Sequence, residues 1–261
     1  MPGDAGYREG VCGRYATTRS AADLSALFEA LDETDDPAPD YNVAPTDPAP
    51  AVRLDRAGDR VLSVGRWGLL PHWARDPRMG ARMINARAET VATARAYAES
   101  FAIRRCLVPA DGWYEWVRLG GPAAAPGGGR AARSRGRAGA AKQAYFMTPA
   151  DGSVLALAGL WSSWGPGRLL TFCVVTTPAV GTLAAVHDRM PLALPPDRWA
   201  AWLEAPGPDP ALLEPAPEWF LGGLEIRPVG PAVGNVHHDG PDLIARVPAA
   251  PLPDLAGPTL F

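Results

Sequence analysis

The chain has 261 residues, of which 47% are hydrophobic and 20% charged, with a formal net charge of −3. This length and composition allow one large globular domain or two small ones, and no apolar run reaches the roughly 18 residues that a membrane-spanning helix needs. The first residues show neither the basic nor the apolar region of a secretory signal. The three cysteines fit no disulfide framework and no paired zinc spacing, so we expect a cytoplasmic protein without metal or cofactor.

In chain order, residues 1–11 are predicted to form an unstructured leader. Ser20 and Asp23 have the spacing of a helix N-terminal cap, and Leu24, Leu27 and Phe28 follow at helical intervals. Residues 32–40 are acidic and contain proline, which is typical of a loop. Strands are predicted over 52–54, 61–66, 103–108, 113–117, 144–148, 154–160 and 169–176, and helices over 89–101 and 196–204. Short strands with few helices predict a single α+β domain with a mixed or antiparallel sheet.

Residues 120–142 are rich in Gly, Ala and Pro and contain five basic residues and no acidic one, which leaves a net charge of −8 on the rest of the chain. The segment has almost nothing to bury, so we predict a disordered loop between two strands. Residues 248–261 are predicted to be a Pro-rich tail. Bulk charge does not favour a nucleic-acid partner, which would have to be held by a few focused arginines.

Cys12, in the run Val11-Cys12-Gly13-Arg14-Tyr15, is the first candidate for chemistry. A cysteine at a true N-terminus carries both an α-amine and a thiol. Such a 1,2-aminothiol captures an aldehyde first as an imine and then as a five-membered thiazolidine ring. The sequence therefore raises the question of whether Cys12 reaches the N-terminus.

Glu115 and His187 are the candidate acid–base groups. Glu115 stands between Tyr114 and Trp116, and apolar surroundings of this kind raise the pKa of a carboxyl group towards neutrality. His187 is of a type that titrates near physiological pH. The alternatives are a strand glutamate that points to solvent and a histidine that caps an element or fills the core. His237 and His238 are adjacent and have no other ligand at a suitable spacing, which disfavours zinc.

Three arginines lie within two residues of candidate site positions: Arg14, Arg87 and Arg189. The planar donor fork of arginine suits phosphate, so the three could hold a nucleic-acid backbone over the site, or they could form ordinary surface ion pairs. Trp67, Trp73 and Trp113 could stack on bases, although tryptophans are usually core residues.

Seven short segments, in this order, resemble the motifs of the SOS-response-associated peptidase (SRAP) family. They are Cys-Gly-Arg-Tyr at 12–15, Tyr-Asn-Val-Ala-Pro at 41–45, Trp-Gly-Leu-Leu-Pro at 67–71, Ile-Asn-Ala-Arg-Ala-Glu-Thr at 84–90, Ala-Asp-Gly-Trp-Tyr-Glu-Trp at 110–116, His-Asp-Arg-Met-Pro-Leu at 187–192 and Ala-Val-Gly-Asn-Val-His at 232–237. The resemblance extends from Cys12 to about Ile244. It implies a compact α+β domain, here residues 12–247, with a β-barrel-like core and a positively charged groove.

The resemblance also implies a DNA-damage function, namely a covalent crosslink to abasic sites in single-stranded DNA with possible lyase activity. Its catalytic residues would be Cys12, Asn85, Glu115 and His187. Its DNA-binding residues would be Arg14, Asn42, Pro45, Trp73, Arg87 and Arg189. The implied partners are abasic single-stranded DNA and the replication machinery, with the protein a monomer in the bacterial cytoplasm that joins the nucleoid when bound to DNA.

Two features depart from the family pattern. Many members begin Met-Cys, whereas here residues 1–11 precede Cys12, so either this leader is removed autocatalytically or Val11, through a GTG codon, is the real start of translation. In addition, Ala74 stands where some members have a second tryptophan. Two rival functions remain open: a cysteine peptidase that acts on other proteins through Cys12 and His187, and a non-covalent binder of modified or single-stranded DNA.

Overall fold

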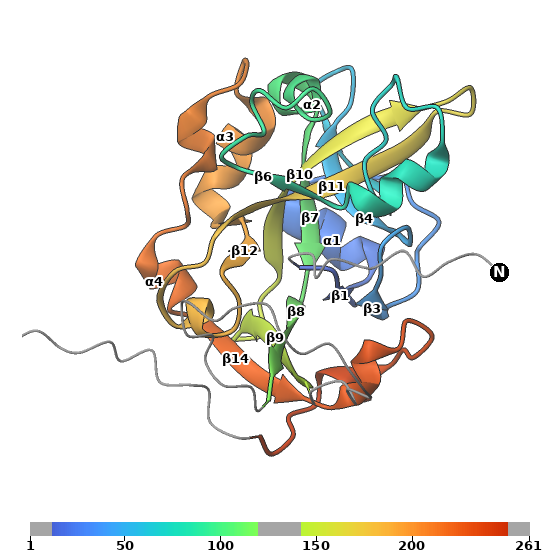
Figure 1. Ribbon diagram of the computed structural model, residues 1–261. Helices are drawn as coiled ribbons and strands as arrows, with labels where there is room; N and C mark the ends of the chain where they lie inside the picture. Colours follow the sequence, from blue (N-terminus) through green and yellow to red (C-terminus); the bar gives the residue numbers. More distant parts are fainter. Residues whose placement is uncertain (1–11, 120–141, 250–261) are drawn as a thin grey trace, which may run out of the picture.

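The computed structural model describes residues 12–119 and 142–249 of the chain (Figure 1). The predicted leader at 1–11 lies outside the described residues, as do all but the last residue of the predicted loop at 120–142 and all but the first two residues of the predicted tail. These three predictions therefore remain predictions. No helix in the described ranges is both long and apolar enough to span a membrane.

The centre of the fold is a closed barrel of five strands. They are β4 (Pro48–Leu54), β5 (Arg60–Trp67), β7 (Arg105–Ala110), β10 (Leu155–Trp164) and β11 (Leu169–Pro178). Neighbours are antiparallel in the order β5-β4-β7-β10-β11, and a short parallel pairing between β11 and β5 closes the ring. The predicted single α+β domain with a β-barrel-like core is thus confirmed.

Four short strands extend the barrel at its edges. They are β2 (Leu31–Asp32), β6 (Asn85–Arg87), β12 (Arg189–Pro191) and β13 (Ala193–Leu194). The last part of β11 carries β6, which runs parallel to it, and β12, which runs antiparallel to it. This arrangement brings the segment around Asn85 and the segment around Arg189 to the same end of β11.

A second, antiparallel sheet packs beside the barrel, in the order β14-β9-β8-β1-β3. Its strands are β1 (Tyr15–Thr17), β3 (Asp40–Val43), β8 (Gly112–Arg118), β9 (Lys142–Pro149) and β14 (Leu224–Val229). Only Asp111 separates β7 from β8, so the chain passes directly from the barrel into this sheet (Figure 1). The pairing of Tyr15 on β1 with Trp113 on β8 places the start of the described chain beside Glu115.

Helices are few and short. The α-helices are α1 (Ala21–Phe28), α2 (Ala98–Ile103), α3 (Trp199–Glu204) and α4 (Glu218–Leu221), and the 3-10 helices are η1 (Pro77–Arg82), η2 (Gly181–Ala185), η3 (Pro196–Arg198), η4 (Pro210–Leu213), η5 (Pro231–Gly234) and η6 (Pro241–Ile244). The predicted cap of α1 is present, because the Ser20 side chain accepts a hydrogen bond from the Asp23 N–H at 3.1 Å. Phe28 at the end of α1 packs on Trp199 of α3 with ring centroids 4.6 Å apart.

The prediction of a helix over 89–101 is wrong for most of its length. Only Ala98–Ile103 is helical, and the residues before it form turns. The side chain of Tyr97 explains this departure, because its hydroxyl donates to the backbone oxygen of Asn85 at 3.0 Å and Val91 is fully buried. Tertiary contacts at these two positions override the helix propensity of the alanines between them.

Candidate active site

Cys12 and Glu115 form the centre of the site. The backbone N–H of Cys12 donates to Oε1 of Glu115 at 2.6 Å, across 103 residues of sequence. Glu115 lies on β8, and the antiparallel pairing of β1 with β8 carries Cys12 to it. The structure therefore places the Cys12 backbone nitrogen directly against a carboxyl group.

Glu115 is buried, with 4% of its surface exposed. The pKa of this carboxyl is raised to about 8: burial is the main cause, the hydrogen bond from Cys12 lowers the value, and the nearby charge of Asp188 adds a smaller rise. The alternative of a glutamate that points to solvent is excluded. The raised pKa keeps this carboxyl largely protonated near neutral pH, and its role in acid–base chemistry stays a prediction.

The Cys12 residue is itself fully buried and has an unusual backbone. Burial and the neighbouring Glu115 raise the pKa of its thiol well above the ordinary value, so the thiol is not a free thiolate in this state. Its φ of 41° lies in the left-handed region, which is uncommon for a residue with a side chain. The torsion φ is defined through the carbonyl carbon of the preceding residue. Removal of that residue would therefore remove the need for Cys12 to hold a left-handed φ.

Asn85 holds the other side of Cys12. Its Nδ2 donates to the Cys12 carbonyl oxygen at 3.2 Å. Asn85 begins β6, which β11 holds through the Val174 pairing, and the Tyr97 hydroxyl fixes the Asn85 backbone oxygen. Cys12 is thus hydrogen-bonded through its nitrogen to Glu115 and through its oxygen to Asn85.

His187 lines a narrow cavity together with Glu115. The cavity is bounded by Trp113, Glu115, Met147, Leu183, Val186, His187, Arg189 and Met190. His187 lies in the turn before β12, and its Nδ1 accepts a hydrogen bond from the Arg189 N–H at 3.0 Å. Asp188 Oδ1 lies 2.9 Å from the same nitrogen. The structure therefore brings together all four predicted catalytic residues.

Arg14 and Asn42 form a structural pair beside the site. Arg14 Nη1 donates to Asn42 Oδ1 at 2.8 Å and to the Val233 carbonyl at 3.1 Å. The Asn42 side chain is buried and donates to the carbonyls of Asn235 and His238. Asn42 thus links β3 to the segment 235–238 and orients Arg14. In this structure its role is therefore to support the site.

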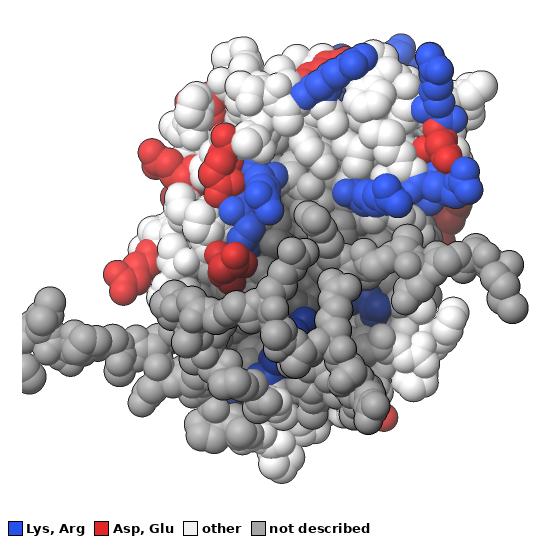
Figure 2. Space-filling model, viewed as in Figure 1, with Lys and Arg blue, Asp and Glu red and all other residues white. Residues whose placement is uncertain are grey.

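The other two predicted arginines differ sharply from each other. Arg87 ends β6 and its side chain is exposed. Arg189 is held in an ion pair with Glu89, and only 11% of its side chain is exposed. Figure 2 shows the wider pattern, since the visible basic side chains stand in separate groups, several of them beside acidic ones.

Pro45 and Trp73 are the remaining two predicted DNA-binding residues. Pro45 is partly exposed in the turn between β3 and β4. Trp73 is half-buried, and the Arg95 guanidinium lies 5.0 Å from its ring centroid, a cation–π distance. Within the described residues, neither has a hydrogen bond or ion pair to Cys12, Asn85, Glu115 or His187, so their DNA-binding roles remain predictions.

The sequence analysis missed three residues that contact the site. Tyr97 fixes Asn85, Asp188 lies against His187, and Glu89 pairs with Arg189. Glu89 and Asp188 stand inside recognised motifs but were given no role. Tyr97 has no signal in the sequence, because its partner is the backbone of a residue on another element.

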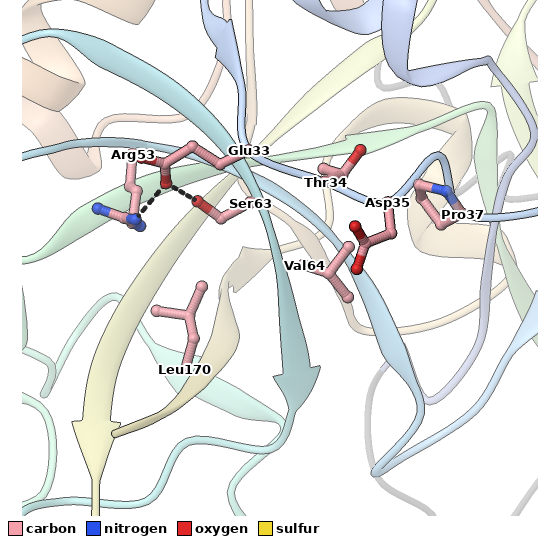
Figure 3. A pocket seen from close by; sticks show the side chains of 8 residues that line it. All are labelled: Glu33, Thr34, Asp35, Pro37, Arg53, Ser63, Val64 and Leu170. Atoms are coloured by element: carbon pink, nitrogen blue, oxygen red, sulfur yellow. Dashed lines mark hydrogen bonds and ion pairs between the residues drawn. The ribbon is translucent and has the colours of Figure 1, made fainter. Parts of the chain in front are cut away.

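A wider cavity of about 520 Å³ lies beside β5 and the start of β11, ahead of the residues at which these two strands pair (Figure 3). Glu33, Asp35, Ser63 and Leu170 are among its lining residues. Glu33 accepts from both Arg53 and Ser63, and Asp35 also lies in the cavity. This cavity is separate from the candidate active site, because the two sets of lining residues have no member in common. Its carboxylates would also repel a phosphate backbone.

Comparisons with known proteins agree with the geometry. The family model described as SOS response associated peptidase (SRAP) matches residues 11–236. The protein named abasic site processing protein YedK of Escherichia coli is 32% identical over 91% of this chain and 100% of its own length. YoqW of Bacillus subtilis, with the same descriptive name, is 29% identical over 90% of this chain and 99% of its own length.

Solved structures show the same fold. A crystal structure from Bacteroides thetaiotaomicron covers 90% of this chain and all of its own, with a TM-score of 0.70 and 19% identity. A phage-related protein from Bordetella bronchiseptica matches with a TM-score of 0.61 and 27% identity, over 84% of this chain and 94% of its own. With the family model matching most of its length, the chain belongs to the SOS response associated peptidase family.

Proposed function

We propose that this protein processes abasic sites in single-stranded DNA by a covalent crosslink from Cys12. The observation that carries the proposal is the 2.6 Å contact between the Cys12 nitrogen and the buried carboxyl of Glu115. The names of the relatives support the substrate, since each is called an abasic site processing protein. The aldehyde of a ring-opened abasic sugar is the electrophile that an N-terminal aminothiol captures.

The proposed crosslink begins with the neutral α-amine of Cys12, which attacks the aldehyde carbon and forms a carbinolamine. Glu115 donates a proton to the hydroxyl, which leaves as water, and the resulting carboxylate takes the remaining proton from the nitrogen, so that a neutral imine forms and Glu115 is protonated again. The Cys12 sulfur then adds to the imine carbon while the thiol proton passes to the nitrogen, which closes the thiazolidine. An α-amine with a pKa of about 7.7–8.0 is far more often neutral at pH 7.4 than a lysine with a pKa near 10.4.

Exposure of the amine is a separate step of the proposal. If residues 1–11 are translated, the Cys12 sulfur attacks the carbonyl of Val11 and the bond to the Cys12 nitrogen breaks. Glu115 relays the proton of the thiol to the departing amine, so that the carboxyl ends in the state in which it began. Water then hydrolyses the thioester and releases the leader. The contact of Glu115 with this nitrogen and the left-handed φ of Cys12 support this route. If translation starts at Val11, removal of the initiator methionine exposes Cys12 directly.

Weak lyase activity follows from the same intermediate. The imine acidifies the proton on the neighbouring sugar carbon, and loss of that proton expels the 3′ phosphate by β-elimination. His187, which shares a cavity with Glu115, is the proposed base. Arg87 and Arg14 are proposed to hold phosphates on either side of the lesion, with binding that weakens as salt rises.

The test is incubation with a single-stranded oligonucleotide that carries one abasic site, followed by a denaturing gel. We expect a shifted band from the wild type and from Cys173→Ala, a control that removes a buried thiol outside the site, and none from Cys12→Ala.

A non-covalent binder would give no shifted band. A peptidase that uses only the thiol would keep its activity when the α-amine is blocked, whereas crosslinking would be lost. Intact mass of the Cys12→Ala variant expressed from the native gene distinguishes the two origins of the Cys12 terminus, because this variant retains residues 1–11 only if they are translated.

A further inference from the structure

The barrel wall has a gap along the edge of β5 that faces away from β4. On this edge β2 pairs with residues 61–62 of β5, and β11 pairs with residues 66–67. Within the described ranges, no strand pairs with residues 63–65 on this edge. The cavity of about 520 Å³ lies at this gap, because Val64 of β5 and Leu170 of β11 are among its lining residues (Figure 3).

The backbone of Val64 points into the gap. Val64 lies opposite Pro50 of β4, and a proline has no N–H with which to form a hydrogen-bonded pair. The N–H and C=O of Val64 therefore face away from β4. The Glu33 N–H donates to the Leu62 carbonyl at 2.9 Å, which shows the same direction two residues earlier in β5. Val64 thus offers one donor and one acceptor to an added strand.

The loop that borders the gap is acidic. Residues 32–36 contain four carboxylates, and among the described residues that line the cavity Arg53 alone is basic. Arg53 is already paired with Glu33, at 2.9 Å between Nη2 and Oε2. The Asp35 side chain is exposed, lies beside Val64 in Figure 3, and has no ion pair or hydrogen bond to a described residue. A segment that enters the gap is therefore favoured if it carries positive charge.

The gap is separated from the candidate active site along β11. Leu170, in the cavity, lies four residues before Val174, which pairs with Asn85. At about 3.3 Å per strand residue, this interval is roughly 13 Å. A short segment bound in the gap therefore leaves the candidate active site free.

We propose that this gap, at residues 63–65, is the docking site for a short, extended, basic segment of a partner protein. The segment adds to the edge of β5 through hydrogen bonds with the N–H and C=O of Val64, as in other cases of β-strand addition. Its cationic side chains face Asp35. The side chain between them points to the other face and is apolar, so that it packs on Leu170. This docking goes beyond the processing of abasic sites, and its test needs no DNA.

The first test is hydrogen exchange at the Val64 amide, measured by NMR with the peptide acetyl-Lys-Val-Lys-Val-Lys-amide as the probe. At a peptide concentration ten times its Kd, exchange at this amide should slow by about tenfold. An exchange rate that the peptide does not change would overturn the proposal, as would the absence of saturable binding up to millimolar peptide. An amide already protected in the free protein would also overturn it, because another part of this chain or a second copy would then fill the gap.

Fluorescence anisotropy with a labelled form of the same peptide separates the charge from the backbone contacts. Asp35→Asn should weaken binding by about threefold. The matched control is Asp242→Asn, which removes an exposed carboxylate on η6 and should leave binding unchanged. Equal effects of the two substitutions would contradict the placement of the cationic side chains.

Two N-methylated peptides test the strand geometry without any change to the protein. One is methylated at the nitrogen of the central lysine and the other at the nitrogen of the valine before it. Only alternate N–H groups of a strand face a given neighbour, so one of the two peptides should bind about fivefold more weakly than the other. Equal binding of the two peptides would rule out strand addition at Val64.

Discussion

Replacement of Glu115 by glutamine is predicted to stabilise the leader-bearing chain at alkaline pH. Burial raises the pKa of Glu115 from 4.5 to about 8 when the Cys12 nitrogen is part of a peptide bond. A carboxyl whose pKa is higher in the folded than in the unfolded state contributes stability at low pH, and this contribution disappears as the pH rises through the folded value. The difference between the unfolded and folded pKa values corresponds to on the order of 5 kcal/mol in the free energy of unfolding. This stability is lost between about pH 4.5 and pH 8.

Glutamine has nearly the same shape and no charge to bury. It can still accept the Cys12 N–H, so we expect the glutamine variant to keep a nearly constant free energy of unfolding across this range. The measurement is urea unfolding at pH 5, 6.5 and 8.5. Both proteins carry Cys12→Ala so that the leader stays attached.

The predicted result is that the Cys12→Ala protein loses several kcal/mol between pH 5 and pH 8.5, while the Cys12→Ala, Glu115→Gln protein does not. Protein with a free Cys12 terminus should fall between them, because its α-ammonium lies against the carboxylate and offsets part of the burial cost. The reasoning would be refuted if the free energy of unfolding had the same pH dependence with and without Glu115. It would also be refuted if the glutamine variant were the less stable protein at pH 8.5.

Three further substitutions test other parts of the structure. Asn42→Ala removes hydrogen bonds to Arg14 and to two backbone carbonyls and should cost roughly 3 kcal/mol in chemical unfolding; a loss below about 0.5 kcal/mol would contradict its supporting role. Gly112→Ala places a Cβ 2.3 Å from the Met147 carbonyl oxygen, so its melting temperature should drop by several degrees, and an unchanged value would show that β8 and β9 can separate freely. Arg87→Ala should weaken binding to single-stranded DNA and lower the salt slope by about 0.7, whereas an unchanged slope would remove Arg87 from the phosphate contacts.

The strands of the barrel could be predicted because they are long enough to show the residue pattern that is typical of a strand. Residues 61–66 and 169–176 were assigned as strands, and the structure has β5 and β11 there. The strands β1, β6 and β12 have three residues each, too few for any periodicity to appear. They form because partners distant in sequence supply their hydrogen bonds, which a local pattern does not reveal.

The resemblance to the family supplied the members of the candidate site, but it did not supply their contacts. From its aromatic neighbours alone, Glu115 could be either a buried carboxyl or a strand residue that points to solvent, and the structure shows that it is buried. The same reasoning treated Arg87 and Arg189 alike, although one is exposed and the other is paired with Glu89, 100 residues away. An arginine looks the same in a sequence whether its partner is a phosphate or a carboxylate on another strand.

The central claim is that the bond to the abasic site forms at Cys12 with its α-amine free. The most direct measurement is digestion of the crosslinked species followed by mass spectrometry of the peptide that carries the nucleotide remnant. The expected result is a peptide that begins at Cys12 and bears the sugar adduct on its first residue. An adduct on a peptide that retains residues before Cys12, or one that forms equally well in Cys12→Ala, would contradict the claim.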